Sequence, residues 1–210
     1  MRVGVAGYGL SGEVFHCPLI EATPGMEVAV VVTSNEERSS KAAARYPGAE
    51  VVPDIADAWN GIDLLVVASP NRSHAELALG AVERDLPVVI DKPLAATLDE
   101  AERVNRAGGR VTVFQNRRWD GDFMTLRSIL DEGSLGQIVR FESRFERFRQ
   151  EIRDAWRESG DPLDGGGQLA DLGAHLIDQA IVLFGPPNNV YAEVDTRRPG
   201  AVTDDDVFIA

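Results

Sequence analysis

The sequence contains little cysteine and no long hydrophobic run. The single cysteine, Cys17, excludes an internal disulfide framework and is typical of a protein from a reducing compartment. No uninterrupted apolar stretch approaches the roughly 20 residues that a membrane-spanning helix needs. The first apolar run is interrupted by glycines, which argues against a signal peptide. We therefore expect a cytoplasmic protein.

Positive charge is also scarce, because 21 lysines and arginines stand against 34 aspartates and glutamates, for a net charge of −13. A chain of this sign repels nucleic acids and anionic membranes, and the arginines of residues 140–153 alternate with glutamates instead of forming a basic patch. We expect neither nucleic acid nor membrane as a partner. Hydrophobic residues make up 44% of the 210 residues, which excludes a wholly disordered chain.

The first part of the chain alternates short β-branched runs with alanine-rich stretches of helical spacing. The apolar runs are continuous, as is typical of strands buried on both faces. The helical stretches include residues 75–82 and 98–107, the second of which ends at two glycines. This alternation predicts an α/β fold, with a doubly wound parallel sheet and helices on both of its faces. The runs lie at residues 3–6, 28–32, 64–68, 88–90 and 111–114.

The pattern changes near residue 119, so we expect one domain over residues 1–118 and another over residues 119–210. The spacing predicts helices at 119–130 and 169–184 and strands at 190–194 and 207–209. Residues 138–148 have both helical and strand spacing, and we favour a strand. Because so small a sheet would expose an unpaired edge, we expect the chain to be part of a longer protein. The alternative is a short protein whose sheet edge is covered by a partner.

A glycine-rich turn, Gly7-Tyr8-Gly9-Leu10-Ser11-Gly12, directly follows the first strand and opens a helix. The first glycine permits the tight turn, the second lets the backbone approach a pyrophosphate, and the third allows close packing of helix and strand. The amino end of the helix then faces the anion. In this context the turn predicts a Rossmann-type domain that binds a dinucleotide.

The residues after the second strand bear on the choice of dinucleotide. Proteins specific for NAD place an acidic residue there, whereas this chain has Thr33 and Ser34, with Arg38 one turn further on. Ser34 and the Arg38 guanidinium can hydrogen-bond a 2′-phosphate, which favours NADP. The neighbouring acids Glu36 and Glu37 keep NAD possible, with Arg38 then a solvated charge.

Polar segments follow three further strands, at the end of the sheet where such folds place function. Lys92 lies between a strand and a proline. The proline restricts the backbone of Lys92 to an extended conformation and so fixes the direction of its side chain. In a partly desolvated cleft a lysine can relay a proton, although a lone lysine is more often a surface residue. The candidate residues in these segments, all expected near the coenzyme, are Ser69, Pro70, Asn71, His74, Asp91, Lys92, Gln115 and Trp119.

The helix expected at 169–184 carries Asp171 and His175 one turn apart, with Asp178 on roughly the same side. An imidazole beside a carboxylate can act as an acid and base near neutral pH. The alternative is a core histidine that its neighbour merely satisfies. We expect no metal, because no cysteine or second histidine lies near this pair to complete a site.

Taken in order, GYGLSG, SPNRSH, DKP and DLGAHLID resemble the Gfo/Idh/MocA oxidoreductases along the whole chain. Three stretches, FHCP, FQNRRWD and DLGAHLIDQ, resemble the branch of NADP-dependent scyllo-inositol dehydrogenases. The resemblance implies that Asp91-Lys92-Pro93 replaces the family's Glu-Lys-Pro and that Lys92, Asp171 and His175 are catalytic. It also implies a second domain with an open, mainly antiparallel sheet, and a homo-oligomer, dimer or tetramer, in the full-length protein.

The expected activity is hydride transfer between NADP(H) and a secondary alcohol or ketone of a sugar or polyol. Two alternatives stay open. One is a non-catalytic NADP-binding sensor or subunit, and the other is a reductase of another carbonyl, such as that of a keto-sugar nucleotide.

Overall fold

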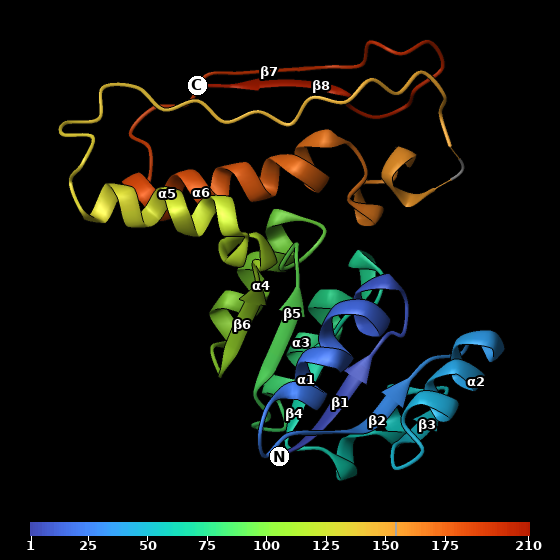
Figure 1. The fold of residues 1–210 in the computed structure, drawn as a ribbon. Coiled ribbons are helices and arrows are strands. Elements are labelled where there is room, and N and C mark those ends of the chain that lie inside the picture. The colour runs from blue at the N-terminus through green and yellow to red at the C-terminus, as the bar shows by residue number, and fades with distance from the viewer. Residues whose placement is uncertain (154) are drawn as a thin grey trace. The chain divides into compact units, whose positions relative to one another are not determined.

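The computed structural model describes residues 1–153 and 155–210. The chain divides into two compact units, Met1–Phe114 and Gln115–Ala210, which are coloured blue to green and green to red in Figure 1.

The first unit contains a six-stranded sheet in the order β3-β2-β1-β4-β5-β6, and all of its neighbouring strands run parallel. This order is that of a dinucleotide-binding doubly wound sheet, whose strand order reverses between β1 and β4. The expected α/β fold is thereby confirmed. The strands are β1 (Arg2–Ala6), β2 (Glu27–Val32), β3 (Glu50–Val52), β4 (Leu64–Val67), β5 (Val88–Asp91) and β6 (Val111–Phe114).

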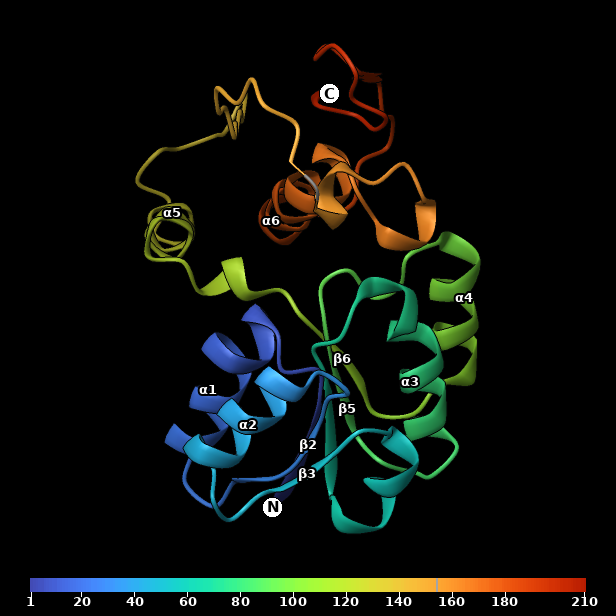
Figure 2. The ribbon, with the colours of Figure 1, turned by 90° about the vertical axis from the view of Figure 1, so that its right-hand side faces the viewer.

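Helices cover both faces of this sheet, with α1 and α2 on one side and α3 and α4 on the other (Figure 2). A π-helical segment, Ser11–His16, runs directly into α1. Asn35 caps α2 through its side chain, and Thr97 and Glu100 form a capping box at α4, which satisfies amide groups that have no partner inside the helix. The helices are α1 (Cys17–Ala22), α2 (Glu36–Arg45), α3 (His74–Val82) and α4 (Leu98–Ala107).

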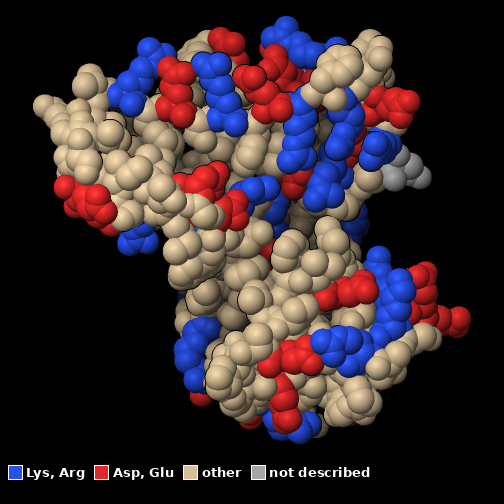
Figure 3. All heavy atoms as spheres, in the orientation of Figure 1, with Lys and Arg blue, Asp and Glu red and all other residues tan. Residues whose placement is uncertain are grey.

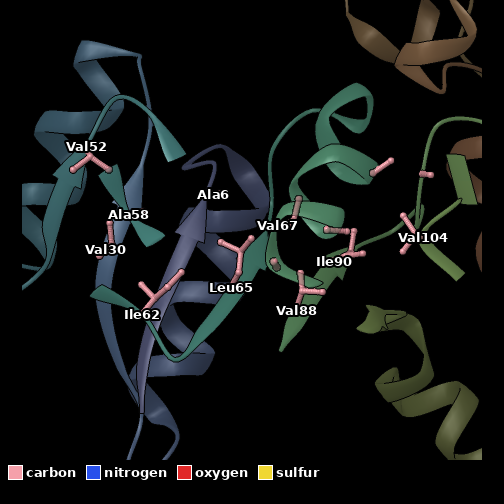
Figure 4. Close-up of a cluster of buried hydrophobic side chains, with 14 of the residues drawn as sticks. Ala6, Val30, Val52, Ala58, Ile62, Leu65, Val67, Val88, Ile90 and Val104 are labelled. Carbon is pink, nitrogen blue, oxygen red and sulfur yellow. The ribbon is translucent and has the colours of Figure 1, made fainter. Parts of the chain in front are cut away.

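Two hydrophobic clusters, one on each face, explain why the strand sequences are continuously apolar. Along β2, Val30 joins the cluster that contains the buried residues of α3 and α4, while Val31 joins the cluster with α1 and α2. Leu65 and Val66 of β4 divide in the same way, because successive strand residues point to opposite faces. Figure 4 shows the first of these clusters along the sheet.

The second unit begins with a short 3₁₀ turn, Asn116–Trp119, followed by α5 (Gly121–Asp131). A second long helical segment consists of a π-helical part, Leu169–Gly173, and α6 (Ala174–Phe184). Strands β7 (Ala192–Asp195) and β8 (Asp206–Ile209) form a two-stranded antiparallel sheet. Both helices and both C-terminal strands therefore form near their expected positions.

The strand expected at 138–148 is wrong, because this segment forms neither strand nor helix. A strand needs a neighbour for its amide and carbonyl groups, and among the described residues β7 and β8 pair only with each other. Val139 and Phe148 are 95% and 96% exposed, whereas the ring of Phe141 packs on that of Phe184 with centroids 5.2 Å apart. The segment therefore buries only part of its apolar side chains and pairs with no strand.

Charged side chains of both signs are interspersed on the face shown in Figure 3. Arg140 and Arg144 both pair with Glu142, as the interleaved sequence suggests. Within the described part of the chain, no helix combines the length and the apolar character required to cross a bilayer.

Candidate functional site

The glycine turn after β1 is shaped by its neighbours. Gly7 has φ +103°, and a Cβ there would collide with the carbonyl of Ala68, while a Cβ on Gly12 would collide with the carbonyl of Gly7. The amide of Gly7 donates to the carbonyl of Val32 over 2.9 Å. A Cβ on Gly9 would meet only the Arg38 guanidinium within 4 Å. The backbone at Gly9 therefore stays approachable, which fits the pyrophosphate of a dinucleotide.

The residues after β2 place a cation beside this turn. Arg38 Nη1 and Cζ lie 3.8 and 3.9 Å from the position that a Gly9 Cβ would occupy. The amide of Arg38 donates to Asn35 Oδ1 over 2.9 Å, so the cap of α2 fixes the backbone from which the guanidinium extends. The adjacent acid Glu37 pairs with Lys41 over 2.8 Å, and this hydrogen bond lowers the pKa of the Glu37 carboxyl.

The carboxylate of Asp91 joins the glycine turn to the lysine. Asp91 Oδ1 accepts from the backbone amide of Lys92 over 2.8 Å, and Oδ2 accepts from the hydroxyl of Ser11. Ser11 belongs to the helix that the turn opens. The structure thus brings together three predicted site residues from opposite ends of the first unit's sequence.

His16, which sequence reasoning did not single out as a site residue, lies against the same carboxylate. Its Nε2 is 3.9 Å from Asp91 Oδ2, and its ring packs on Phe114 with centroids 4.7 Å apart. The side chain is buried. Burial lowers the pKa of His16, and the charge of Asp91 opposes this effect. The buried imidazole therefore packs against the carboxylate that accepts from the amide of Lys92.

The loop after β4 and the segment after β5 are joined by His74. Nδ1 lies 2.7 Å from the carbonyl oxygen of Pro93, and Nε2 lies 2.9 Å from that of Ser69. The Lys92–Pro93 peptide bond is cis. Ser69 Oγ and Ser73 Oγ are 2.6 Å apart, and Ser73 donates to the carbonyl of Pro70. His74 is buried, and in this structure it contacts backbone on both sides.

In the second unit, the turn between β7 and β8 holds the start of the helix that carries Asp171 and His175. The amide of Leu169 donates to Asp204 Oδ2 over 2.7 Å. Gly167 has φ +92°, and a Cβ there would collide with the side chain of Asp204. A carboxylate at the amino end of a helix satisfies a free amide and matches the helix dipole.

Asp171 receives a hydrogen bond from an arginine that the sequence did not suggest. Arg157 Nε donates to Asp171 Oδ2 over 2.7 Å, and its guanidinium lies 4.3 Å above the Trp156 ring. His175, one turn further along, is 6% exposed. No spacing rule signals Arg157, because it reaches Asp171 from a separate 3₁₀ turn, Trp156–Glu158, rather than from the same helix.

Asp178 is engaged in a different contact. Its two carboxylate oxygens accept from Arg118 Nε and Nη2 over 2.8 and 2.6 Å. Gln179 Nε2 donates to the carbonyl of Arg117 over 3.0 Å. These bonds tie α6 to the turn that begins the second unit.

Gln115 and Trp119, both expected near the coenzyme, lie in that turn and belong to the second unit. Trp119 is 72% exposed. The Oε1 atom of Gln115 is buried and has no hydrogen-bond partner among the residues that the structure describes. The coenzyme contacts of both residues stay predictions.

The candidate site residues fall into two groups, one in each unit. The first unit brings together the glycine turn, Arg38, Asp91, Lys92 and His74, and the second places Asp171 and His175 on one helical segment. The meeting of Lys92 with His175 stays a prediction. Across residues 1–153 and 155–210, no cluster of three or more His, Cys, Asp or Glu side chains could hold a metal ion.

Two family models match the chain. The model described as "Oxidoreductase family, NAD-binding Rossmann fold" (GFO_IDH_MocA) matches residues 1–112, and the GFO/IDH/MocA C-terminal domain matches residues 123–210. The first match identifies the first unit as an NAD(P)-binding Rossmann fold.

Individual relatives match along nearly the whole chain. The uncharacterised oxidoreductase YdgJ of Escherichia coli (strain K12) is 46% identical over 98% of this chain and 60% of its own length. The scyllo-inositol 2-dehydrogenase (NADP(+)) IolW of Bacillus subtilis (strain 168) is 37% identical over 98% of this chain and 58% of its own. The solved structure of yvaA from Bacillus subtilis has a TM-score of 0.91 at 37% identity, covering 99% of this chain and 60% of that one. The chain therefore spans about 60% of the length of these relatives.

Proposed function

We propose, from the premise that the chain belongs to the Gfo/Idh/MocA family of NAD-binding oxidoreductases, that it transfers hydride between NADP(H) and a secondary alcohol or ketone of a sugar or polyol. The observation that carries the proposal is that the Asp91 carboxylate accepts hydrogen bonds from both the Lys92 amide and the Ser11 hydroxyl. The link from Lys92 through one carboxylate to the dinucleotide turn supports the proposal, because folds of this type bind their ligands at this end of the sheet.

The preference for NADP is supported by the cation beside the glycine turn. A 2′-phosphate is a dianion that a planar guanidinium binds with two parallel hydrogen bonds. Arg38 lies against Gly9, and the neighbouring Glu37 is paired with Lys41. Thr33 and Ser34 add hydroxyl donors after the same strand. NAD remains a possible second coenzyme, since nothing at this position repels a ribose hydroxyl.

The glycine turn and Arg38 would hold the coenzyme, and the nicotinamide ring supplies the hydride acceptor or donor when it is bound. In oxidation of an alcohol, His175 takes the hydroxyl proton on an imidazole nitrogen and returns it in the reverse direction. Lys92 donates a hydrogen bond to the same oxygen and stabilises the negative charge that develops there. Asp171 accepts from the substrate hydroxyls or from the imidazole and so orients them.

A polyol or sugar is proposed as the substrate because carboxylate, imidazole, ammonium and guanidinium groups suit a molecule rich in hydroxyls. IolW of Bacillus subtilis is named as a scyllo-inositol 2-dehydrogenase, and another relative, of Saccharopolyspora erythraea, as an inositol 2-dehydrogenase at 34% identity. Both names concern those proteins, and for this chain an inositol-like substrate is our proposal. We also propose that the full-length protein is a homo-oligomer.

The direct test incubates the protein with NADP and a panel of inositols and aldoses and follows the absorbance of reduced nicotinamide. We expect turnover of at least one polyol, and we expect His175→Ala to lower kcat by roughly 10²–10⁴-fold with unchanged NADP affinity. Ile177→Ala, at a partly exposed position on the same helix, is the matched control and should keep kcat. Unchanged turnover in His175→Ala would remove the imidazole from the reaction.

A further inference from the structure

Strands β4 and β5 are neighbours, and their register runs from Leu65 opposite Val88 to Val67 opposite Ile90. Beyond these residues the two strands no longer pair with each other, so the ladder of backbone hydrogen bonds between them ends there. One loop contains Ser69, expected near the coenzyme, and the other contains Lys92. Some other contact must fix the distance between the two loops if the coenzyme and the lysine are to keep a constant separation.

His74 makes that contact. Its side chain is 1% exposed, and it is the first residue of α3. One ring nitrogen lies against the Pro93 carbonyl at 2.7 Å and the other against the Ser69 carbonyl at 2.9 Å. The imidazole ring therefore bridges the two loops at the point where the strands no longer pair.

We propose that His74 is a positioning residue with two separable halves. The Nδ1 half acts through the Pro93 carbonyl and sets the position of Lys92, the preceding residue. The Nε2 half acts through the Ser69 carbonyl and sets the loop that faces the coenzyme. The part assigned to Lys92 rests on the proposed function, whereas the bridge itself does not.

Two amide side chains separate these halves. When asparagine replaces histidine, its amide nitrogen takes roughly the place of Nδ1, and the amide nitrogen of glutamine takes roughly the place of Nε2. His74→Asn therefore offers an N–H to the Pro93 carbonyl and none to the Ser69 carbonyl, whereas His74→Gln does the reverse. A residue that served stability alone would show no such division.

The expected results cross over. His74→Asn should weaken NADPH binding about 3- to 10-fold, as expected for one lost polar contact, and it should lower kcat much less than His74→Gln does. His74→Gln should bind NADPH normally and lose kcat by on the order of 10²-fold, as expected when a catalytic group is displaced by about an ångström. Val104→Ala, on the buried face of α4, is the control for lost stability and should change neither quantity.

The lysine half has a readout that needs no turnover. Within residues 1–210, lysine occurs at positions 41 and 92. Reductive methylation with ¹³C-formaldehyde labels both side chains, and the signal that disappears in Lys92→Arg is that of Lys92. His74→Gln should move the Lys92 signal, His74→Asn should leave it in place, and Lys41, on the exposed face of α2, serves as the internal reference.

The inference is overturned if the two variants change coenzyme affinity and the Lys92 signal to the same extent, or if neither changes them. Should the wild-type protein turn over no polyol, the proposed function fails on its own. The NADPH affinities and the Lys92 signal then still decide whether His74 bridges the two loops.

Discussion

Coenzyme choice should depend on one exposed side chain, that of Arg38. Its guanidinium lies beside Gly9 of the dinucleotide turn. A hydrogen bond to a charged group contributes about 1.5–3 kcal/mol, and because Arg38 is exposed, we take the low end of that range. Since about 1.4 kcal/mol corresponds to a tenfold change in affinity, Arg38→Gln should raise the Kd of NADPH about 10- to 30-fold. The Kd of NADH, which lacks the phosphate, should change less than about twofold.

The substitution should leave the local fold in place. The bond that caps α2 runs from the backbone amide of Arg38 to Asn35, so it survives a change of side chain, and glutamine is nearly as good a helix former as arginine. Both affinities can be measured by quenching of tryptophan fluorescence at constant ionic strength. Lys41→Gln removes another cation of the same helix, one that already pairs with Glu37, and should leave the NADPH to NADH ratio unchanged.

Arg38→Glu sharpens the test, because it replaces an attraction by a repulsion of the dianionic phosphate. The loss of NADPH affinity should then exceed that of Arg38→Gln, and raised salt should reduce the difference. If either variant weakened both coenzymes equally, Arg38 would act on the shared part of the dinucleotide. The assignment of NADP from this end of β2 would then be refuted.

Two further predictions concern buried groups of the first unit. Because burial lowers the pKa of His16, the unfolded chain takes up a proton near pH 6.5 while the folded chain resists it. Stability should therefore fall as the pH drops below about 6.5, by at most about 1.4 kcal/mol per pH unit. Urea midpoints from pH 5 to 8 should show this, and a His16→Gln profile as steep as the wild-type one would contradict it. Burial raises the pKa of the Cys17 thiol to about 12, so at pH 8 its thiolate should be about 10³-fold scarcer than that of an ordinary thiol. Labelling with a thiol reagent should be slow in buffer and fast in urea, and equal rates in both would place Cys17 at the surface.

The elements of the first unit could largely be predicted from the sequence, because burial on both faces leaves a signal in each strand separately. Val30 and Val31 face opposite clusters, so the run through them is apolar at every position. β3 (Glu50–Val52) has no such signal. It is a three-residue edge strand that pairs with β2 alone, and its sequence is too short to show a period.

The failure at 138–148 has the opposite cause. Its sequence has the alternation of a strand, but a strand also needs a neighbour to pair with, and this requirement cannot be read from a local pattern. β7 and β8 supply that neighbour for each other, with Val194 opposite Val207. Periodicity therefore predicts which side chains a segment can bury, such as Phe141 against Phe184, and leaves open whether its backbone finds a strand to pair with.

The site shows the same limit at the level of single contacts. The glycine turn and Lys92 could be proposed because local chemistry requires those residue types after a strand. The bonds that fix them could not, because Ser11 lies 80 residues from Asp91 and His74 lies 19 residues from Pro93. Arg157 reaches Asp171 from a separate 3₁₀ turn, 14 residues away along the chain. Such contacts depend on which strand ends become neighbours, and only the sheet order determines that.

The order β1-β4-β5 makes Lys92 dependent on two side chains that are not themselves on its strand. Ser11, after β1, reaches the Asp91 carboxylate that accepts from the amide of Lys92, and His74, after β4, reaches the carbonyl of Pro93. Both neighbours of Lys92 are therefore anchored. Asp91 accepts from Ser11 of the glycine turn, and the carbonyl of Pro93 contacts His74, whose other ring nitrogen contacts the loop that contains Ser69. A shift of the bound dinucleotide would therefore reach the ammonium through short polar contacts on both sides. For that reason, we expect coenzyme binding and lysine position to respond together to most substitutions in this unit, and to separate only where one bond of a bridge is removed at a time.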